Sequence, residues 1–220
     1  MIDYQKFYDD LKNGASFFGL TLSDSQIQEF FYYYRLLLQW NSQVNLISKS
    51  DIVRFIDYHI LDSLKVVSVF DLKNVNTLFD FGSGAGIPGI PISLCFSDIS
   101  SLLVDSRTKR CKFLNEVVLL LSLHNVCVLK SRIETIPESY NEMYDVVVTR
   151  ATVSLDKFFL LGSRFLSPKG SMISIKGECI DNEISALKNI LNQKLFSFEI
   201  KSPINVLNVR TGTIIIITRK

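Results

Sequence analysis

The sequence of 220 residues contains few of the residues from which most catalytic and metal-binding sites are built. It has two histidines, one tryptophan and four cysteines. The cysteines form no CxxC pair and lie within apolar runs, at Cys95, Cys111, Cys127 and Cys179. Such cysteines are typical of buried free thiols in a reducing compartment. The sequence therefore predicts no disulfide framework and no metal site.

An excess of charge and a long apolar run are also missing. The 24 basic residues are nearly balanced by 22 acidic ones, which leaves a net charge of +2. This balance does not indicate a protein that coats nucleic acid, although it allows a local basic patch. The first ten residues are polar and acidic, unlike a secretory signal, and no apolar run approaches the length that spans a bilayer. We therefore expect a cytoplasmic protein without a membrane partner.

The chain changes its pattern once, near residue 75. In the first part, Ser23 to Gln26 have the form of a capping box, and apolar residues then recur at helical spacing. In the second part, short apolar segments alternate with helical stretches. The pattern predicts a helical extension of three or four helices over residues 1–75, packed on an α/β domain over residues 76–220.

The second part predicts a doubly wound, mostly parallel sheet of seven strands. Five short apolar segments separated by helical stretches have the character of strands buried on both faces: 77–81, 101–105, 126–130, 144–149 and 171–176. Two further strands, 195–200 and 213–218, have no convincing helix between them and predict an antiparallel hairpin at one sheet edge. The fold class is thus Rossmann-like, and ligands of such folds bind beyond the carboxyl ends of the strands.

A glycine-rich loop, FGSGAGIPG, follows the first of these strands. It is no P-loop, because Ile90 stands where that motif requires lysine. A dinucleotide fingerprint fits poorly, because its only match begins at Gly84, after the strand has ended, and Pro88 removes an amide donor. A carboxylate beside a glycine loop suits a cationic ligand such as S-adenosylmethionine, and a tight turn without a ligand is the simpler alternative. The residues of this pattern are Asp80, Gly82, Gly84 and Gly86.

Polar residues also end the other predicted strands. Asp105 closes the second strand, residues 131–134 follow the third, Arg150 follows the fourth and Lys176 the fifth. Because the carboxyl ends of parallel strands lie at one edge, these residues predict a binding site there. Asp105 is placed to accept the ribose hydroxyls of either a nicotinamide or an adenosyl cofactor, so by itself it does not distinguish them.

The chain resembles the glucose-inhibited division protein B family over nearly its whole length. The resemblance rests on WNSQVNL (40–46), HILDSL (59–64), the glycine loop with its PGIP continuation, LVDSRTKRCKFL (103–114), SRIE (131–134), VVVTRA (146–151) and SPKGSMISIKG (167–177). Members of this family methylate N7 of a guanine in small-subunit ribosomal RNA. Arg107 and the segment NLISKS depart from the family's more usual residues, which affects the detail of RNA contact.

The resemblance implies a role for each matched position. The cofactor would be S-adenosylmethionine, and the substrate would be the guanine at conventional position 527 of 16S ribosomal RNA. Asp105 would hold the ribose, Ile133 and Glu134 would face the adenine, and Arg150 would lie beside the methyl group or the incoming base. The simpler alternative for Arg150 is a salt bridge to Glu134 or Asp80 that only shapes the pocket. The implied cofactor residues are Asp80, Gly82, Gly84, Gly86, Ile87, Asp105, Ile133, Glu134 and Arg150. A basic rim for RNA would comprise Arg107, Lys109, Arg110, Arg132 and Lys176.

The implied reaction explains the scarcity of acid–base residues. Guanine N7 carries a lone pair and no proton, so the enzyme has to position the reactants and needs no general base. Of the two histidines, His124 follows a long apolar helix, and His59 is expected either to pack between the extension and the sheet or to contact RNA. A nicotinamide-dependent oxidoreductase and a non-catalytic ribosome-binding protein remain alternatives. We expect a monomer.

Overall fold

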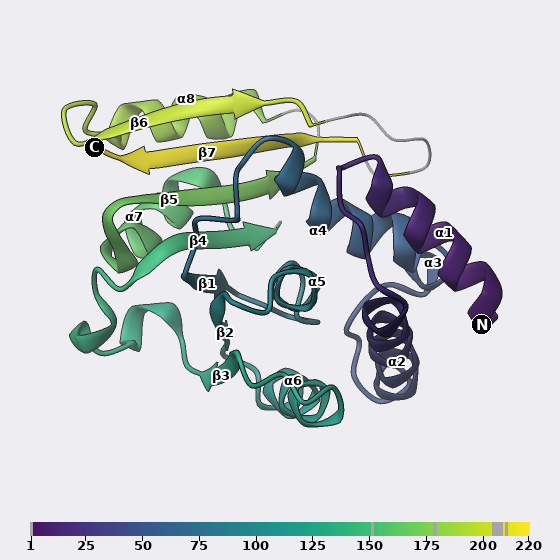
Figure 1. Ribbon diagram of the computed structural model, residues 1–220. Coiled ribbons are helices and arrows are strands. Elements are labelled where there is room, and N and C mark those ends of the chain that lie inside the picture. The colour runs from purple at the N-terminus through teal and green to yellow at the C-terminus, as the bar shows by residue number, and fades with distance from the viewer. Residues whose placement is uncertain (1, 151, 178–179, 204–208, 210) are drawn as a thin grey trace.

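A computed structural model of the protein describes residues 2–150, 152–177, 180–203, 209 and 211–220. Its centre is a seven-stranded sheet in the order β3-β2-β1-β4-β5-β7-β6 (Figure 1). The strands span Thr77–Phe81 (β1), Ser100–Asp105 (β2), Val126–Lys130 (β3), Tyr144–Arg150 (β4), Leu166–Lys176 (β5), Phe196–Lys201 (β6) and Thr213–Arg219 (β7). Strands β1 to β5 pair in parallel, and β7 pairs antiparallel with both β5 and β6. The predicted sheet and its terminal hairpin are confirmed.

Helices cover both faces of the sheet (Figure 1). Helices α5 (Gly89–Cys95) and α6 (Thr108–Leu120) share one hydrophobic cluster with the N-terminal helices. Helices α7 (Leu155–Gly162) and α8 (Asp181–Ile190) pack in a second cluster against the other face. Short 3₁₀ turns, η3 (Ile133–Thr135), η4 (Glu138–Tyr140) and η5 (Ser163–Phe165), complete the connections. The parallel strands are therefore buried from both sides, which explains their nearly continuous apolar sequences.

The N-terminal part is helical, as predicted, but its last element is not a regular α-helix. It contains α1 (Tyr4–Ser16), α2 (Asp24–Asn41) and α3 (Lys49–Ile52), followed by the π-helix η1 (Ile56–Leu61), α4 (Asp62–Leu64) and η2 (Lys65–Ser68). The predicted capping box is confirmed, because the Ser23 and Gln26 side chains each bond the other residue's backbone. The wider turn η1 overlaps the start of the HILDSL segment, and π-turns inside helices occur frequently at functional sites.

Polar contacts tie α2 to the glycine-loop half of the sheet. The buried Tyr33 hydroxyl donates to the Ala85 carbonyl at 2.6 Å, and Gln26 donates to the Leu94 carbonyl at 2.9 Å. The Trp40 indole donates to Glu116 of α6 at 3.0 Å, and its ring packs on Phe113. The helices and the sheet therefore share one core. The division at residue 75 remains a prediction about the chain's organisation.

The prediction that the cysteines are buried is only partly correct. Cys111 is buried in α6, Cys95 is half-buried, and Cys127 is exposed. Its neighbours Val126 and Val128 belong to the cluster that contains α6, so the Cys127 side chain lies on the opposite face of the edge strand β3, where it is exposed. Cys179 lies outside the described residues. No helix among the described residues is long and apolar enough to cross a membrane.

The shared core predicts that the helical extension and the sheet unfold together. Trp40, the only tryptophan, lies where α2 meets α6, so its fluorescence reports that contact. We expect the fluorescence transition in urea to coincide with the loss of far-ultraviolet circular dichroism, as in a two-state transition. A fluorescence transition at clearly lower urea would instead mean that the extension unfolds as a separate unit.

Candidate active site

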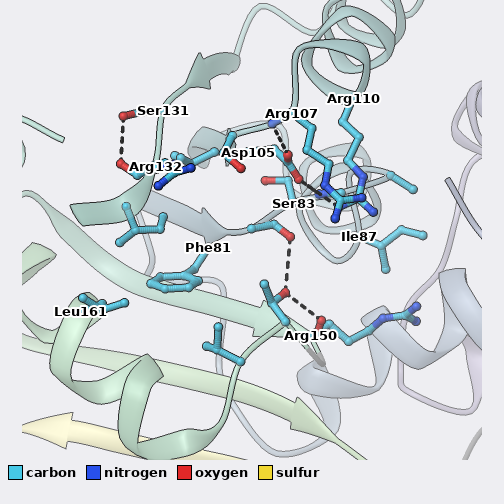
Figure 2. Close-up of a pocket in the computed structure, with 18 of the residues that line it drawn as sticks. Phe81, Ser83, Ile87, Asp105, Arg107, Arg110, Ser131, Arg132, Arg150 and Leu161 are labelled. Atoms are coloured by element: carbon cyan, nitrogen blue, oxygen red, sulfur yellow. Dashed lines mark hydrogen bonds and ion pairs between the residues drawn. The ribbon is translucent and has the colours of Figure 1, made fainter. Parts of the chain in front are cut away.

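A cavity of about 650 Å³ opens at the carboxyl edge of the sheet (Figure 2). Its walls come from the glycine loop after β1, the segments after β2, β3 and β4, helix α7 and the loop between α2 and α3. The pocket therefore lies where ligands of doubly wound folds bind. Of the predicted cofactor residues, seven line it: Gly82, Gly84, Ile87, Asp105, Ile133, Glu134 and Arg150.

The glycine loop brings backbone to the pocket at positions where a side chain would not fit or would be strained. Gly82 has φ +75°, and a Cβ on it would lie 2.5 Å from the Thr152 methyl carbon. Gly84 has φ +59°, and a Cβ there would meet no atom closer than 3.7 Å, so the loop at Gly84 faces open space. Gly86 is also left-handed but packs toward Ile90 and does not line the cavity. The geometry gives Gly86 a role in shaping the loop, and its predicted contact with the cofactor remains a prediction.

Asp80 also lies away from the pocket, contrary to the prediction. Its side chain is fully buried beneath the loop, where a carboxylate oxygen accepts from the Gly89 amide at 3.1 Å. Burial raises the pKa of Asp80 to about 7, because the charged form is poorly solvated there; hydrogen bonds from Gly89 and Ser83 only partly offset this increase. Side chains alternate between the two faces of β1, and the Asp80 side chain lies on the face that α5 covers. Asp80 therefore supports the glycine loop from beneath.

Asp105 connects the glycine loop to the start of α6. Its Oδ2 accepts from the Gly84 amide at 3.0 Å and from the Arg110 guanidinium at 3.3 Å, and its Oδ1 accepts from the Arg107 amide at 2.8 Å. The side chain is almost buried, at 6% exposure, and lines the pocket (Figure 2). Each carboxylate oxygen has two lone pairs, so these bonds leave acceptor capacity on Oδ1 for a hydroxyl donor. Its position in the pocket agrees with the predicted ribose contact, which remains a prediction.

The segment after β3 forms one end of the pocket. Ile133 and Glu134 line it together with Ser131 and Arg132, and Leu161 of α7 lies across from them (Figure 2). Ile133, Leu161 and Phe81 present apolar surface there, while Ser131 and Glu134 are polar. An apolar cleft with polar groups at its rim is suited to a heteroaromatic ring. The proposed adenine contacts are thus compatible with this end of the pocket.

Arg150 is held by the HILDSL segment and not by the carboxylates proposed from the sequence. One guanidinium nitrogen donates to the Tyr58 carbonyl at 2.7 Å and to Asp62 at 3.0 Å, and the other lies 2.7 Å from His59 Nδ1. The side chain extends from the end of β4 toward the N-terminal helices (Figure 2). The alternative ion pairs of Arg150 with Glu134 or Asp80 are therefore wrong. The reason is that η1 and α4 present a buried carboxylate closer to the end of β4.

His59 and Asp62 complete a buried polar cluster beside the pocket. The Asp62 carboxylate lies between Lys65 Nζ, at 2.6 Å, and Arg150, at 3.0 Å. His59 is 5% exposed, does not line the pocket, and lies 4.0 Å from Asp51 through Nε2. The sequence did not indicate a pairing of His59 with Asp51. These two residues approach each other only because the chain turns between α3 and η1. The interpretation of His59 as a packing residue between extension and sheet agrees with this position.

Only some residues of the predicted basic rim lie on the surface. Arg107, Lys109 and Arg132 are exposed, and Arg110 is half-buried against Asp105. Lys176 does not belong to the rim: it is 8% exposed, pairs with Glu183 at 2.8 Å and donates to the Val153 carbonyl. Helix α8 covers the end of β5, so this lysine ties two elements together. The described residues contain no cluster of histidine, cysteine and acidic side chains that could hold a metal ion.

The pocket residues that were not predicted from the sequence include three from outside the glycine loop and the segments after β2 and β3. Leu46 and Ile47 come from the loop after α2, and Thr152 follows β4 and contacts Gly82 through its side chain. The motif WNSQVNL ends at Leu46, so the sequence did indicate a functional role for this segment. The spacing of the motif did not, however, place Leu46 at the edge of the sheet. Only the tertiary packing of α2 on α5 and α6 does so.

The buried carboxyl group of Asp80 makes stability depend on pH. Its folded pKa of about 7 exceeds the ordinary 3.8, so unfolding between these pH values releases a proton. The free energy of unfolding should therefore fall as pH rises across this interval, by up to about 1.4 kcal/mol per unit. Asp80→Asn should abolish this fall in urea titrations at pH 5 to 8. Asp145→Asn is the control: the pKa of Asp145 is lowered by amide hydrogen bonds, so its effect should be constant over that range. An unchanged slope in Asp80→Asn would contradict the assignment.

Comparisons with known proteins agree with this fold and site. The family profile described as "GidB: rRNA small subunit methyltransferase G" matches residues 26–205. The chain is 38% identical to "Ribosomal RNA small subunit methyltransferase G" of Acetivibrio thermocellus over 84% of its length and 78% of the relative's. It is 34% identical to the protein of the same name from Clostridium beijerinckii, over 84% and 79%.

Two solved structures share the fold at low sequence identity. The M. jannaschii TYW2 in complex with AdoMet has a TM-score of 0.58 and 14% identity, covering 81% of this chain and 80% of that one. A putative caffeoyl-CoA O-methyltransferase from Staphylococcus aureus has a TM-score of 0.57 and 13% identity, covering 85% and 92%. Both support the methyltransferase fold, and the sequence matches are specific: the chain belongs to the family of the rRNA small subunit methyltransferase G.

Proposed function

We propose that the protein transfers a methyl group from S-adenosylmethionine to N7 of the guanine at conventional position 527 of 16S ribosomal RNA in the small ribosomal subunit. The observation that carries this proposal is the left-handed glycine loop joined to Asp105 in one pocket at the carboxyl edge of the sheet. Membership of the family supplies the substrate class.

The pocket has suitable groups for each part of the cofactor. At Gly84, which lines the pocket, a ligand can approach the backbone, and Oδ1 of Asp105 keeps acceptor capacity for a ribose hydroxyl. Ile133 and Glu134 offer an apolar surface and a polar group for an adenine ring. S-adenosylmethionine supplies an electrophilic methyl group on a sulfonium. The chain's own residues have to hold it in one orientation and exclude water from it.

The pocket contains no side chain arranged as a general base. Among the described residues that line it there is no histidine or cysteine, and His59 is directed to Arg150. Guanine N7 needs no deprotonation, so this lack is no obstacle to the reaction. Catalysis then rests on placing nucleophile and methyl carbon in line within about 3–3.5 Å. The pocket walls perform that placement.

Arg150 is the residue we assign to positioning at the reacting centre. It lines the pocket at the end of β4 while its guanidinium is fixed by Asp62, His59 and the Tyr58 carbonyl. A guanidinium presents a planar fork of donors that suits guanine O6, a phosphate or a carboxylate. N7 has to stay free to attack, so O6, a neighbouring phosphate or the cofactor carboxylate is the assigned partner.

Exposed arginine and lysine side chains beside the pocket suit the RNA backbone. Arg107 and Lys109 at the start of α6, and Arg132 after β3, flank the opening, and Arg110 lies between them and Asp105. Phosphate contacts of this kind fix the position of an RNA without reading its sequence. The near-neutral net charge of +2 suits an enzyme that docks on a shaped ribonucleoprotein particle. Such an enzyme would act in the cytoplasm, as a monomer.

The function is tested with small ribosomal subunits from cells that lack the modification. We expect the protein and labelled S-adenosylmethionine to add one methyl group per subunit, located at N7 of the target guanine by nuclease digestion and mass spectrometry. Gly84→Val is the matched control, because a β-branched residue is strained at φ +59° while its Cβ meets open space. It should remain folded and lose cofactor binding. Methylation elsewhere, or binding of NAD in place of S-adenosylmethionine in calorimetry, would refute the proposal.

The basic rim is tested by the salt dependence of subunit binding. Each phosphate contact contributes about 0.7–0.9 to the slope of log affinity against log salt. The double variant Arg107→Ala/Lys109→Ala should therefore bind more weakly and reduce that slope by about 1.5. Lys73→Ala/Lys194→Ala removes the same charge from exposed positions before β1 and β6, at the opposite edge of the sheet, and should leave the slope unchanged. Equal slopes in the two double variants would show that the rim does not contact phosphate.

A further inference from the structure

Two aliphatic residues of the N-terminal segment line the pocket, and none of the cofactor contacts assigned above uses them. Leu46 and Ile47 lie in the loop between α2 and α3, each 8% exposed. They belong to the same hydrophobic cluster as Ala85 and Ile87 of the glycine loop. An apolar wall from an element outside the sheet is therefore built against the loop.

The side chain of Asn41 holds this wall in place. Its carbonyl oxygen accepts from the Leu46 amide at 2.8 Å and the Ile47 amide at 3.0 Å, and its nitrogen donates to the Ile47 carbonyl at 3.1 Å. Asn41 is the last residue of α2, which Trp40 and Tyr33 bind to the sheet half of the protein. The conformation of the wall is thus fixed by three hydrogen bonds from a single amide on an anchored helix.

The wall lies at the end of the pocket opposite the proposed adenine contacts. The segment with Ile133 and Glu134 follows β3, at one edge of the sheet, whereas the glycine loop follows β1 and Arg150 ends β4. Leu46 and Ile47 cluster with the glycine loop, and Arg150 is bound to the neighbouring HILDSL segment. If the adenine occupies the β3 end, the transferable methyl group lies toward the wall and Arg150.

The chemistry of the wall indicates its ligand. The methionine end of the cofactor carries an ammonium and a carboxylate, which lose hydration against aliphatic surface without gaining a partner. A purine ring has apolar faces and polar edges, and enzymes that modify bases hold the extruded base against apolar side chains. We propose, building on the function above, that Leu46 and Ile47 form the platform on which the face of the target guanine rests, and that Asn41 is the positioning residue of this platform.

The platform orients the nucleophile and excludes water. A guanine whose face rests on Leu46 and Ile47 can rotate only in its own plane, so its N7 edge can be aimed by donors at its O6 edge. Arg150 lies in the same pocket to provide such donors. Loss of the platform would allow the ring to tilt out of line with the methyl group, and small misplacements of this kind lower rates strongly.

The test compares cofactor binding with methyl transfer in full-length variants. Asn41→Ala removes all three hydrogen bonds, and Asn41→Asp keeps the two amide acceptors but puts a carboxylate oxygen against the Ile47 carbonyl. We expect Asn41→Ala to lower kcat/KM for small subunits at least tenfold while the Kd for S-adenosylmethionine changes less than twofold. Asn41→Asp should lie between Asn41→Ala and the natural protein. Ile47→Ala should reproduce the loss, and Ile47→Val should show a smaller one.

Asn125→Ala is the matched control for loss of a half-buried side-chain amide. Asn125 also clamps backbone, through the carbonyls of Ser93 and Ile99, but it lies before β3 at the amino edge of the sheet. Asn125→Ala should lower the free energy of unfolding. It should not change kcat/KM for small subunits relative to the Kd for S-adenosylmethionine. Trp40 fluorescence and circular dichroism establish that each variant is folded, and Ile47→Val with Asn41→Asp keep the proposal testable if Asn41→Ala does not fold.

The outcomes separate this inference from the proposed function. If the natural protein methylates N7 while Asn41→Ala and Ile47→Ala transfer within twofold of it, the platform is refuted and the function stands. If the Kd for S-adenosylmethionine rises in parallel with the loss of transfer, the wall belongs to the cofactor site and the inference is wrong. A natural protein that transfers no methyl group to N7 refutes the proposed function itself. A rise in methylation of neighbouring guanines by the Ile47 variants would support the platform directly.

Discussion

The carboxylate of Asp62 lies between two cations, Lys65 of its own segment and Arg150 from the end of β4, and the rest of the site depends on this contact. Asp62 and Lys65 are almost completely buried, and the Arg150 side chain is 14% exposed. Removing one member of such a buried pair leaves an uncompensated charge, at a cost of about 3–5 kcal/mol. The HILDSL segment is thereby fixed to the carboxyl edge of the sheet. The other N-terminal contribution to the pocket, Leu46 and Ile47, is held separately, by Asn41 at the end of α2.

The glycine loop is held in a similar way from three sides. Asp80 binds the Gly89 amide from beneath, Asp105 binds the Gly84 amide from the side of β2, and Tyr33 of α2 donates to the Ala85 carbonyl. Left-handed glycines are costly to order, so a loop that has to keep one shape needs such partners. Two of these contacts come from strands of the sheet and one from the N-terminal helices. The loop's shape is consequently a property of the whole chain and not of the sheet alone.

The sequence predicted the sheet well and the site unevenly, for physical reasons. Period and apolar content placed β1 and β3 at the observed residues, because strands buried on both faces have few alternatives. Asp80 and Lys176 were assigned to a ligand from their type and place beside strand ends, yet one is buried below the loop and the other is paired with Glu183. The side on which a side chain leaves a strand end depends on the covering helices. The partners of Arg150 and the pocket role of Leu46 are tertiary facts, fixed by how α2, η1 and α4 pack.

The dependence of the pocket on the packing of the N-terminal helices explains why a reaction without a general base needs so large an N-terminal extension. The cofactor contacts proposed here come mainly from the glycine loop, the acidic residue at the end of β2 and the segment after β3, and two solved structures of low sequence identity share the fold of this sheet. Selecting one guanine requires surfaces that the sheet does not provide. In the mechanism proposed here they come from Leu46 and Ile47, set by Asn41, and from Arg150, set by Asp62. In each case a pocket residue is bound to a polar side chain of the extension, half-buried in Asn41 and buried in Asp62. Because N7 attacks without proton transfer, orientation is the main contribution the protein can make to the rate, and these fixed contacts supply it.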